Sequence, residues 1–326
     1  MRQNTGNLAD NQVSVLIDCT TVPVFSARLV KLLSNSGVKV EELALPKSTS
    51  DVFKWFWKLK RRPKIVHYLS GDRHPLIYIV SRLLGKKVII HWIGTDVMNA
   101  TCNTKGAFSI LLSKVAYRMA DMHLADFQPL ADELRPLGID AIVVPLVPDI
   151  HSLQEDITWP SEDVALVYLP EWRPEFFGSG IVFRLAEELP EIKFLVVAHS
   201  GEGAPQLPNI KYLGWVDDME TVWKQVKVYL RLTKHDGLSH TVVEALARAK
   251  HVTWSYEFPY CHQARTLEQA KDALTHIFKR NEPNIAGMHY VYSQFAPSKL
   301  VRHYKNIYLQ ILSLTTDSLL NGASRV

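Results

Sequence analysis

Short apolar runs alternate with amphipathic stretches along almost the whole chain, and this alternation constrains the fold more than any other feature. The strand-like runs of the first half are 13–18, 38–45, 64–69, 87–91, 122–125 and 141–144. Helical segments lie between them, as the crossovers of parallel strands require. The first half therefore predicts an α/β domain with a parallel sheet covered by helices on both faces.

The alternation stops at 145–161, a segment that holds three prolines, and then starts again. The strand-like runs of the second half are 164–169, 193–198, 210–213, 226–232 and 251–255. We therefore predict two doubly wound Rossmann-like domains, 1–156 and 157–326, facing each other across a cleft. Ligands of open α/β sheets bind beyond the carboxyl ends of the strands, so the cleft is the expected substrate site.

Composition excludes several classes of protein. The 326 residues suit two domains, and the formal net charge of +4 comes with no zinc-ligand spacing and no RNA-binding signature, so we expect no nucleic-acid partner. Three cysteines lie far apart and predict neither a disulfide framework nor a cysteine metal site. No G-x-G-x-x-G phrase supports a nicotinamide enzyme. No apolar run is long enough to span a membrane, and the polar N-terminus has no signal core. A cytoplasmic location is therefore expected.

The segment 226–249 carries the most specific chemistry. It reads as a strand, a tight turn at Asp236–Gly237, and a helix. Free amides at Leu238 and Ser239 and the helix dipole would attract phosphate. Glu244 lies on the following helix, where its carboxylate can accept hydrogen bonds from a diol such as ribose.

Charged side chains surround the same turn. Asp236 precedes the helix and can accept hydrogen bonds from sugar hydroxyls, while Arg231 and Lys234 bring positive charge. The segment therefore predicts a site for a phosphorylated sugar ligand, and an ordinary helix with an exposed acid is the alternative.

This segment resembles the donor-site motif of retaining glycosyltransferases with the GT-B fold, the broad group 1 or GT4-type family. The family pattern is two acids with seven residues between them, and here Asp236 takes the first position and Glu244 the second. The resemblance implies that Asp236 contacts the transferred sugar and Glu244 the ribose. The sequence departs from the pattern in its shorter first acid, and in Ala249 and His251, which replace a glycine and a proline.

A second resemblance lies at 168–180, after the first strand of the second half. The family has an arginine there and a lysine five residues later, and both contact the donor diphosphate. Arg173 matches the arginine, whereas the lysine position falls near Gly178. The resemblance therefore implies that another cation, Lys234 or Arg231, compensates. A surface arginine paired with a neighbouring glutamate is the alternative for Arg173.

In the first half, the stretch 88–98 reads VIIHWIGTDVM and resembles the acceptor-side loop of the family, where some relatives carry H-G-T-D. Gly94, Thr95 and Asp96 match that phrase, while the histidine stands at His91. The resemblance implies that His91 and Asp96 contact the transferred sugar or the acceptor. A structural histidine and a helix-capping aspartate are the alternatives.

The stretch 53–64 reads FKWFWKLKRRPK and interleaves four aromatic with six basic residues. Aromatic side chains suit a lipid interface and basic ones suit anionic head groups. This pattern predicts a contact with a membrane surface. An amphipathic helix that packs its aromatic residues inward and a nucleic-acid patch are the alternatives.

Together these resemblances imply a retaining glycosyltransferase that needs no metal and no cofactor. Its donor is a nucleoside-diphosphate sugar, with UDP or GDP expected, and its acceptor is a hydroxyl of a glycan or a lipid-linked precursor. The protein would work in the cytoplasm, and any membrane contact would be at the inner face of the cell membrane. Its final helix at 297–314 would cross back to the first domain. Two alternatives stay open: a nucleotide-sugar-binding protein without turnover, and a sugar-nucleotide epimerase on the same two domains.

Overall fold

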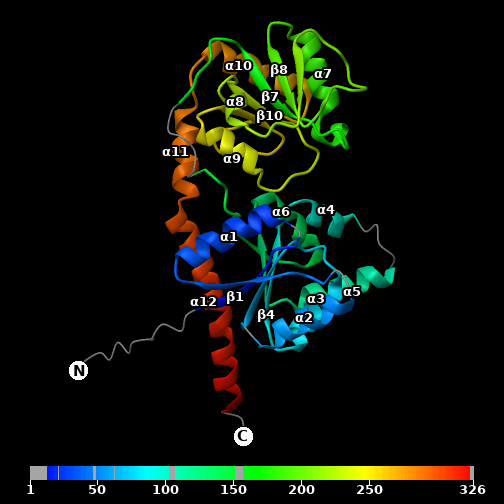
Figure 1. Ribbon diagram of the computed structural model, residues 1–326, viewed down its shortest axis with the longest axis vertical. Helices are drawn as coiled ribbons and strands as arrows, with labels where there is room; N and C mark the ends of the chain where they lie inside the picture. The colour runs from blue at the N-terminus through cyan, green and yellow to red at the C-terminus, as the bar shows by residue number, and fades with distance from the viewer. Residues whose placement is uncertain are drawn as a thin grey trace, which may run out of the picture. The chain divides into compact units, whose positions relative to one another are not determined.

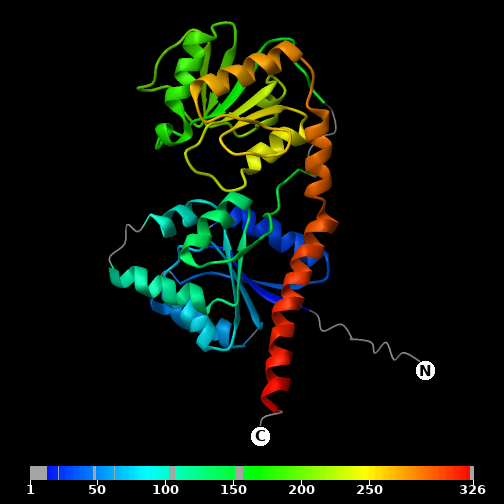
Figure 2. The same ribbon diagram turned by 180° about the vertical axis from the view of Figure 1, so that it is seen from behind.

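The structure is a computed structural model (Figures 1 and 2), and it divides by its internal contacts into two compact units. It describes residues 13–20, 22–46, 49–61, 63–102, 107–150 and 157–323. Unit 1 consists of Met1–Val147 and Pro297–Val326, and unit 2 of Pro148–Ala296. The sequence places the domain boundary at 156, whereas the contacts divide the chain after Val147 and group its last helix with unit 1.

Unit 1 is built on a sheet of six parallel strands in the order β2-β1-β3-β4-β5-β6. The strands are β1 (Ser14–Asp18), β2 (Lys39–Leu43), β3 (Ile65–Leu69), β4 (Lys87–Trp92), β5 (Met122–Ala125) and β6 (Ala141–Val143). The central strand β3 is buried along its whole length, as its apolar sequence predicts.

Right-handed crossovers decide which helix of unit 1 covers which face of this sheet. The helices are α1 (Pro23–Asn35), α2 (Thr49–Arg61), α3 (Pro75–Leu83), α4 (Thr95–Thr101), α5 (Ala107–Met119), α6 (Gln128–Leu134), the 3₁₀ turn η1 (Arg135–Leu137) and α12 (Pro297–Ala323). The chain moves in one direction across the sheet through α2, α3 and α5, so these three helices share a face (Figure 1). Helix α1 leads to the strand on the other side of β1, so it covers the opposite face, where α12 packs against it.

Unit 2 repeats the architecture with six parallel strands in the order β12-β11-β10-β7-β8-β9. The strands are β7 (Val164–Tyr168), β8 (Lys193–Val197), β9 (Ile210–Gly214), β10 (Val228–Arg231), β11 (His251–Trp254) and β12 (His262–Gln263). The helices are η2 (Pro174–Phe177), α7 (Ser179–Glu188), α8 (Glu220–Trp223), α9 (His240–Ala247), α10 (Leu267–Arg280) and α11 (Ile285–Gln294). Helices α7 and α10 pack their apolar stripes onto one face of the sheet and form its main core.

The predicted α/β class with two parallel sheets is confirmed. The sequence patterns missed α4, α11 and β12, because each is short or lacks a clear apolar period. Within the described ranges, no helix is long and apolar enough to cross a membrane.

Two buried lysines hold the start of unit 2 onto its sheet. The Lys227 ammonium group donates to Asp163 Oδ1 at 2.7 Å and to Asn281 Oδ1 at 2.8 Å. Lys250 donates to the backbone and hydroxyl oxygens of Thr158, and burial lowers its pKa to about 8. Both lysines lie at the amino edge of the sheet, so they serve the scaffold and leave the carboxyl edge open for function.

Candidate functional site

A cavity of about 220 Å³ opens in unit 2 where β7, β8 and β10 end and α9 begins. Its lining consists of Leu166, Tyr168, Val197, Ala198, Trp215, Val216, Met219, Trp223, Tyr229, Thr241 and Glu244. The carboxyl edge of a parallel sheet is where α/β proteins bind ligands. This cavity is therefore the candidate site of unit 2.

Helix α9 places two polar side chains in the cavity. The helix starts at His240, and Ser239 is its N-cap, with the hydroxyl oxygen accepting from the Val242 amide at 3.4 Å. Thr241 and Glu244 lie three residues apart and so share a helix face, and both line the cavity. The helix face that the sequence assigned to ribose thus borders a cavity.

The turn before α9 is tightly packed. Gly237 and Leu238 are buried. Gly237 has no positive φ, so what it contributes is its small size in a tightly packed turn and not an unusual backbone angle. Ser239 is also buried, and its hydroxyl oxygen is used for capping. These three residues shape the approach to the helix amides through their backbone.

Asp236 is held by an arginine from the end of β10. The Arg231 Nε–H donates to Asp236 Oδ2 at 2.8 Å, and the Arg231 Nη2–H donates to Oδ1 at 3.0 Å. The Trp254 indole N–H also donates to Oδ2, at 3.3 Å. The side chains of Arg231 and Asp236 are only 13% and 12% exposed, so this is a largely buried bidentate ion pair.

This pairing corrects the role that the sequence suggested for Arg231. Its guanidinium is committed to Asp236 and lies over the rings of Tyr168 and Phe177, 5.6 and 5.1 Å from their centroids. A carboxylate offers about four lone-pair sites, and three of those on Asp236 are used. The remaining site, on Oδ1, can accept one hydroxyl hydrogen bond.

Arg173 and Lys234 both adjoin the turn η2. The Arg173 guanidinium stacks 3.9 Å from the ring centroid of Phe176. Among the described residues it forms no ion pair with the neighbouring glutamates, of which Glu171 instead faces His199. Lys234 is exposed, and its backbone amide donates to the Phe176 carbonyl at 2.9 Å. One short turn therefore links two cations beyond the carboxyl edge of the sheet.

Gly178 lies near the position where the GT4-type pattern has a lysine, and it has no room for a side chain. Its φ is +81°, and a Cβ at this position would lie 2.3 Å from the Leu232 carbonyl oxygen at the end of β10. Such a distance is far below van der Waals contact, so no side chain fits without moving the backbone. The close approach of η2 to β10 thus excludes a lysine at position 178.

Replacing Gly178 by alanine is expected to lower the free energy of unfolding by about 2–4 kcal/mol, from backbone strain and overpacking together. Gly180, two residues later, has no positive φ, and no atom lies within 4 Å of the place that a Cβ would take there, so it is the matched control. Gly180→Ala should be neutral or stabilising by about 0.5–1 kcal/mol, because alanine is the better helix former. Urea unfolding of both variants measures the difference, and equal stabilities would contradict the packing of Gly178.

In unit 1, Asp96 is a structural carboxylate. It accepts hydrogen bonds from the backbone amides of Gly71 at 2.7 Å, Ile93 at 3.1 Å, Gly94 at 2.8 Å and Val97 at 3.1 Å. Burial raises its pKa, while the amide hydrogen bonds act in the opposite direction. Its lone pairs are occupied, so the predicted contact with a sugar or acceptor gives way to the alternative of a capping residue, which ties the loop after β3 to α4.

His91 lies in the core and cannot reach a ligand. Residues alternate between the two faces along β4, and His91 points to the face covered by α12, with no exposed surface. Its Nε2 lies 2.9 Å from the Val144 carbonyl, and its Nδ1 lies 3.2 Å from His67 Nε2. The predicted sugar contact of His91 is therefore wrong for this structure, and the structural alternative holds.

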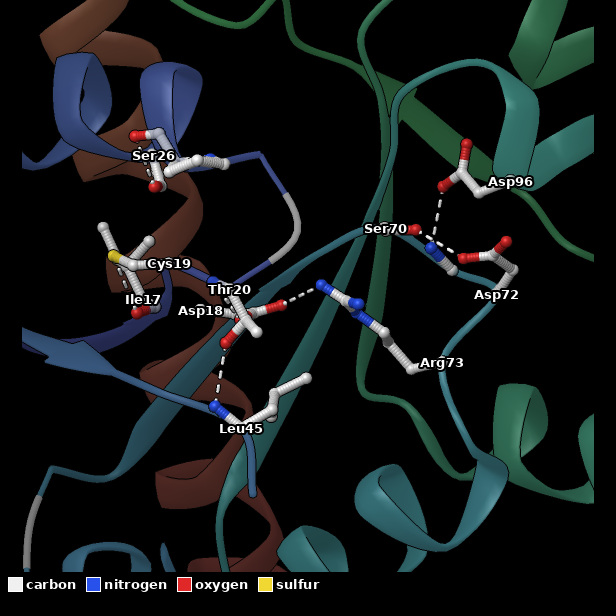
Figure 3. A network of polar contacts seen from close by, with 12 residues as sticks. Ile17, Asp18, Cys19, Thr20, Ser26, Leu45, Ser70, Asp72, Arg73 and Asp96 are labelled. Atoms are coloured by element: carbon white, nitrogen blue, oxygen red, sulfur yellow. Dashed lines mark hydrogen bonds and ion pairs between the residues drawn. The ribbon is translucent and has the colours of Figure 1, made fainter. Parts of the chain in front are cut away.

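A polar cluster that the sequence patterns did not predict lies at the carboxyl edge of the unit 1 sheet (Figure 3). Asp18, at the end of β1, is fully buried and accepts from Arg73 Nη2 at 3.0 Å. Asp72 accepts from the Ser70 hydroxyl and from the Asn99 amide, both at 2.8 Å. Ser70 has a φ of 113°, which is strained for a residue with a side chain. The charged run that follows β3 directly, at 72–74, was the available signal.

No protein-family model matches this sequence, and a comparison with curated protein sequences finds no match. Solved structures do match. HepE of Anabaena in complex with UDP is 12% identical, with a TM-score of 0.66 over 91% of this chain and 100% of HepE. Sucrose-phosphate synthase of Thermosynechococcus elongatus is 11% identical, with a TM-score of 0.66 over 93% of this chain and 100% of that one.

A third match is the lipopolysaccharide outer core galactosyltransferase WaaB, which is 13% identical, with a TM-score of 0.65 over 91% of this chain and 99% of WaaB. These proteins are glycosyltransferases of the GT-B fold. At such low identity the likeness establishes the fold, and the predicted GT-B fold is confirmed.

Proposed function

We propose that this chain is a glycosyltransferase of the retaining group 1 type, and that it moves a sugar from a nucleoside-diphosphate sugar to a hydroxyl acceptor. The observation that carries the proposal is the unit 2 cavity, which brings Glu244 and Thr241 to the carboxyl edge of the sheet beside the start of α9. The GT-B fold of the matching transferases supports it, and HepE was solved with UDP, and with UDP and glucose.

In this proposal the nucleoside occupies the cavity. Glu244 accepts hydrogen bonds from the two ribose hydroxyls, as a carboxylate with several lone pairs can. Trp215 is 80% exposed at the cavity rim and offers a flat ring on which the base can stack. UDP or GDP is the expected nucleotide.

The diphosphate would lie between the first amides of α9 and the cations of the η2 turn. Helix amides and the helix dipole attract phosphate, and Arg173 and Lys234 add two positive charges. These groups are fixed before the reaction, so they can stabilise the charge that develops on the leaving nucleoside diphosphate without a metal ion. Lys234 takes the place of the lysine that position 178 cannot hold.

The transferred sugar would contact Asp236. The one lone pair that Arg231 and Trp254 leave on its carboxylate is suited to a single sugar hydroxyl, and the ion pair fixes its direction. Retention follows if the acceptor hydroxyl attacks from the face that the phosphate leaves, with a donor phosphate oxygen taking its proton. The acceptor is a glycan or lipid-linked hydroxyl, and the protein acts in the cytoplasm.

Contact with a membrane surface through 53–64 belongs to the same proposal. In α2, Trp55 and Leu59 are buried, whereas Phe56 and Trp57 are 37% and 48% exposed. The helix therefore turns some of its aromatic residues inward and some outward. The side chains of Phe53 and Arg61 lie outside the described part of the structure.

Nucleotide binding should raise the melting temperature of the protein by mass action. We expect UDP or GDP to stabilise the wild-type chain more than ADP does, and Glu244→Ala to remove most of that stabilisation because the ribose hydroxyls lose their acceptor. Thermal shift titration with each diphosphate and its sugars is the measurement.

Glu191→Ala is the matched control, because Glu191 is exposed in the turn before β8, at the other edge of the sheet. Undiminished stabilisation of Glu244→Ala would remove Glu244 from the site, and no stabilisation of the wild type by any nucleotide would end the donor proposal. Release of free sugar from the stabilising donor then separates a transferase from a protein that only binds.

A further inference from the structure

The outer face of α5 carries an exposed apolar ridge. Phe108 is 79% exposed, Leu111 is 61% exposed, and Val115 is also exposed. Their spacing of three and four residues places them on one face of the helix. Large apolar side chains that gather on a surface mark a contact with a partner or a membrane.

Positive charge borders this ridge. Lys114 and Arg118 lie one turn apart on the same outer side, both are exposed, and neither forms an ion pair within the described part of the chain. Helix α5 contains no acidic residue. An apolar ridge with a basic border fits the boundary between acyl chains and anionic head groups.

A cavity of about 290 Å³ lies directly beside the basic border. Ser113, Lys114, Tyr117 and Arg118 of α5 form one side, and the turn at 137–140 forms the other. The lining holds two cations, a hydroxyl and an aromatic wall, together with one carboxylate, Asp140. The remaining net positive charge makes the cavity suitable for a phosphate with a small polar head group, while the ridge outside it suits an acyl chain.

Neighbouring helices extend the same character. Helices α2 and α3 cover the same face of the sheet as α5 (Figures 1 and 2). They present Trp57 at 48% and Leu83 at 74% exposure, together with the exposed lysines Lys54 and Lys60. A second copy of the chain would be a poor partner, because a two-fold contact across this face would bring basic residues against basic residues.

We propose that the outer face of α5 docks onto a bilayer that contains anionic phospholipid, and that the cavity beside Lys114 and Arg118 receives a lipid phosphate head group. This inference extends the proposed membrane contact of α2 to a second helix and gives it a head-group site. It is independent of sugar transfer, because binding to vesicles needs no nucleotide.

Co-sedimentation with phosphatidylcholine vesicles, with and without phosphatidylglycerol, tests the proposal. We expect binding only when phosphatidylglycerol is present, and weaker binding at high salt because exposed charges are screened. Lys114→Gln together with Arg118→Gln should weaken the vesicle partition coefficient roughly 30-fold. Phe108→Ser together with Leu111→Ser should weaken it roughly tenfold or more.

Matched controls lie on the opposite face of the sheet. Leu309 of α12 is 53% exposed, and Leu309→Ser should leave vesicle binding unchanged, as should Lys31→Gln with Arg302→Gln on α1 and α12. Circular dichroism shows whether each variant is folded, and the nucleotide-induced thermal shift should be the same in all of them.

Three results would overturn the inference while leaving the proposed transfer reaction untouched. The first is equal binding to vesicles without anionic lipid. The second is a protein that stays in solution with anionic vesicles but gains a thermal shift from inorganic phosphate that Lys114→Gln with Arg118→Gln abolishes, which would assign the cavity to a free anion. The third is a dimer in solution that dissociates on Phe108→Ser with Leu111→Ser, which would assign the ridge to a second copy of the chain.

Discussion

Replacing Asp236 by alanine should lower the free energy of unfolding of unit 2 by about 3–5 kcal/mol, as expected for breaking a buried ion pair. The partner Arg231 stays charged, and without Asp236 its guanidinium is left in a site where the side chain is only 13% exposed. The Trp254 indole N–H loses its acceptor as well. Urea unfolding, followed by the fluorescence of Trp223 and Trp254 beside the site, measures the loss.

A double-mutant cycle isolates the pair from the rest of the site. Arg231→Ala with Asp236→Ala should cost less than the sum of the two single changes, because the double variant leaves no unpaired charge behind. The exposed pair Lys193–Glu162 is the matched control, with side chains 56% and 63% exposed. Glu162→Ala should cost at most about 1 kcal/mol. Additive losses at Arg231 and Asp236 would contradict the coupling.

The pair also bears on how the site would work. A carboxylate fixed in direction by a bidentate arginine needs little reorganisation when a sugar hydroxyl arrives. The charged side chains of the site therefore form two groups. Arg231 is ion-paired with Asp236, whereas Arg173 and Lys234 lie beside η2. The proposed diphosphate site thus relies on cations that lack this buried pairing.

Local patterns in the sequence sufficed for the fold and for the order of the elements that border the unit 2 cavity. Strand β10, the turn at Asp236–Gly237 and helix α9 follow one another within a few residues, so propensity and spacing predict their order. The pairing of Arg231 with Asp236 is equally close in sequence. We did not predict this pairing because the sequence shows which residues are charged, but not which of them point toward each other after the strand ends and the chain turns.

Contacts between segments that are distant in sequence decide the roles of several side chains, and the sequence could not reveal these contacts. His91 looked available for a ligand because its strand neighbour His67 and its cover, α12, are distant in sequence. The sequence shows that the family's lysine is absent near Gly178, but it does not show that the Leu232 carbonyl oxygen, just after β10, lies 2.3 Å from the place that a Cβ would take there. Both cases have one cause: a motif gives residue types and spacing, whereas burial depends on what packs against them.

The buried histidines of unit 1 form a chain of hydrogen bonds. The group at one end of this chain, a backbone carbonyl, determines which ring nitrogens carry the protons. The Val144 carbonyl can only accept, so His91 Nε2 donates to it and His91 Nδ1 accepts from His67 Nε2–H. His67 Nδ1 then accepts from the Tyr308 hydroxyl at 2.9 Å. Both rings are neutral in this arrangement, and a proton added to His91 Nδ1 would point at the His67 N–H.

We expect unit 1 to lose stability as the pH falls below about 6.5, the ordinary pKa of histidine. Burial lowers the pKa of His91 to about 3, and burial and the neighbouring His91 ring lower that of His67. The unfolded chain therefore binds protons at a pH where the folded unit does not, so the stability is present above the unfolded pKa and is lost on acidification. Each histidine contributes a slope that approaches about 1.4 kcal/mol per pH unit.

Hydrogen exchange of the β3 and β4 peptides, at a series of urea concentrations from about pH 7 down to about pH 5, measures this loss in unit 1 itself. His67→Leu with His91→Leu should flatten the pH dependence by up to about 3 kcal/mol per pH unit, even though the orphaned Tyr308 hydroxyl and Val144 carbonyl lower the stability at every pH. His303 of α12 is exposed, so His303→Leu is the matched control and should keep the wild-type slope. An unchanged slope in the double variant would mean that these two histidines are not the groups whose protonation opposes folding.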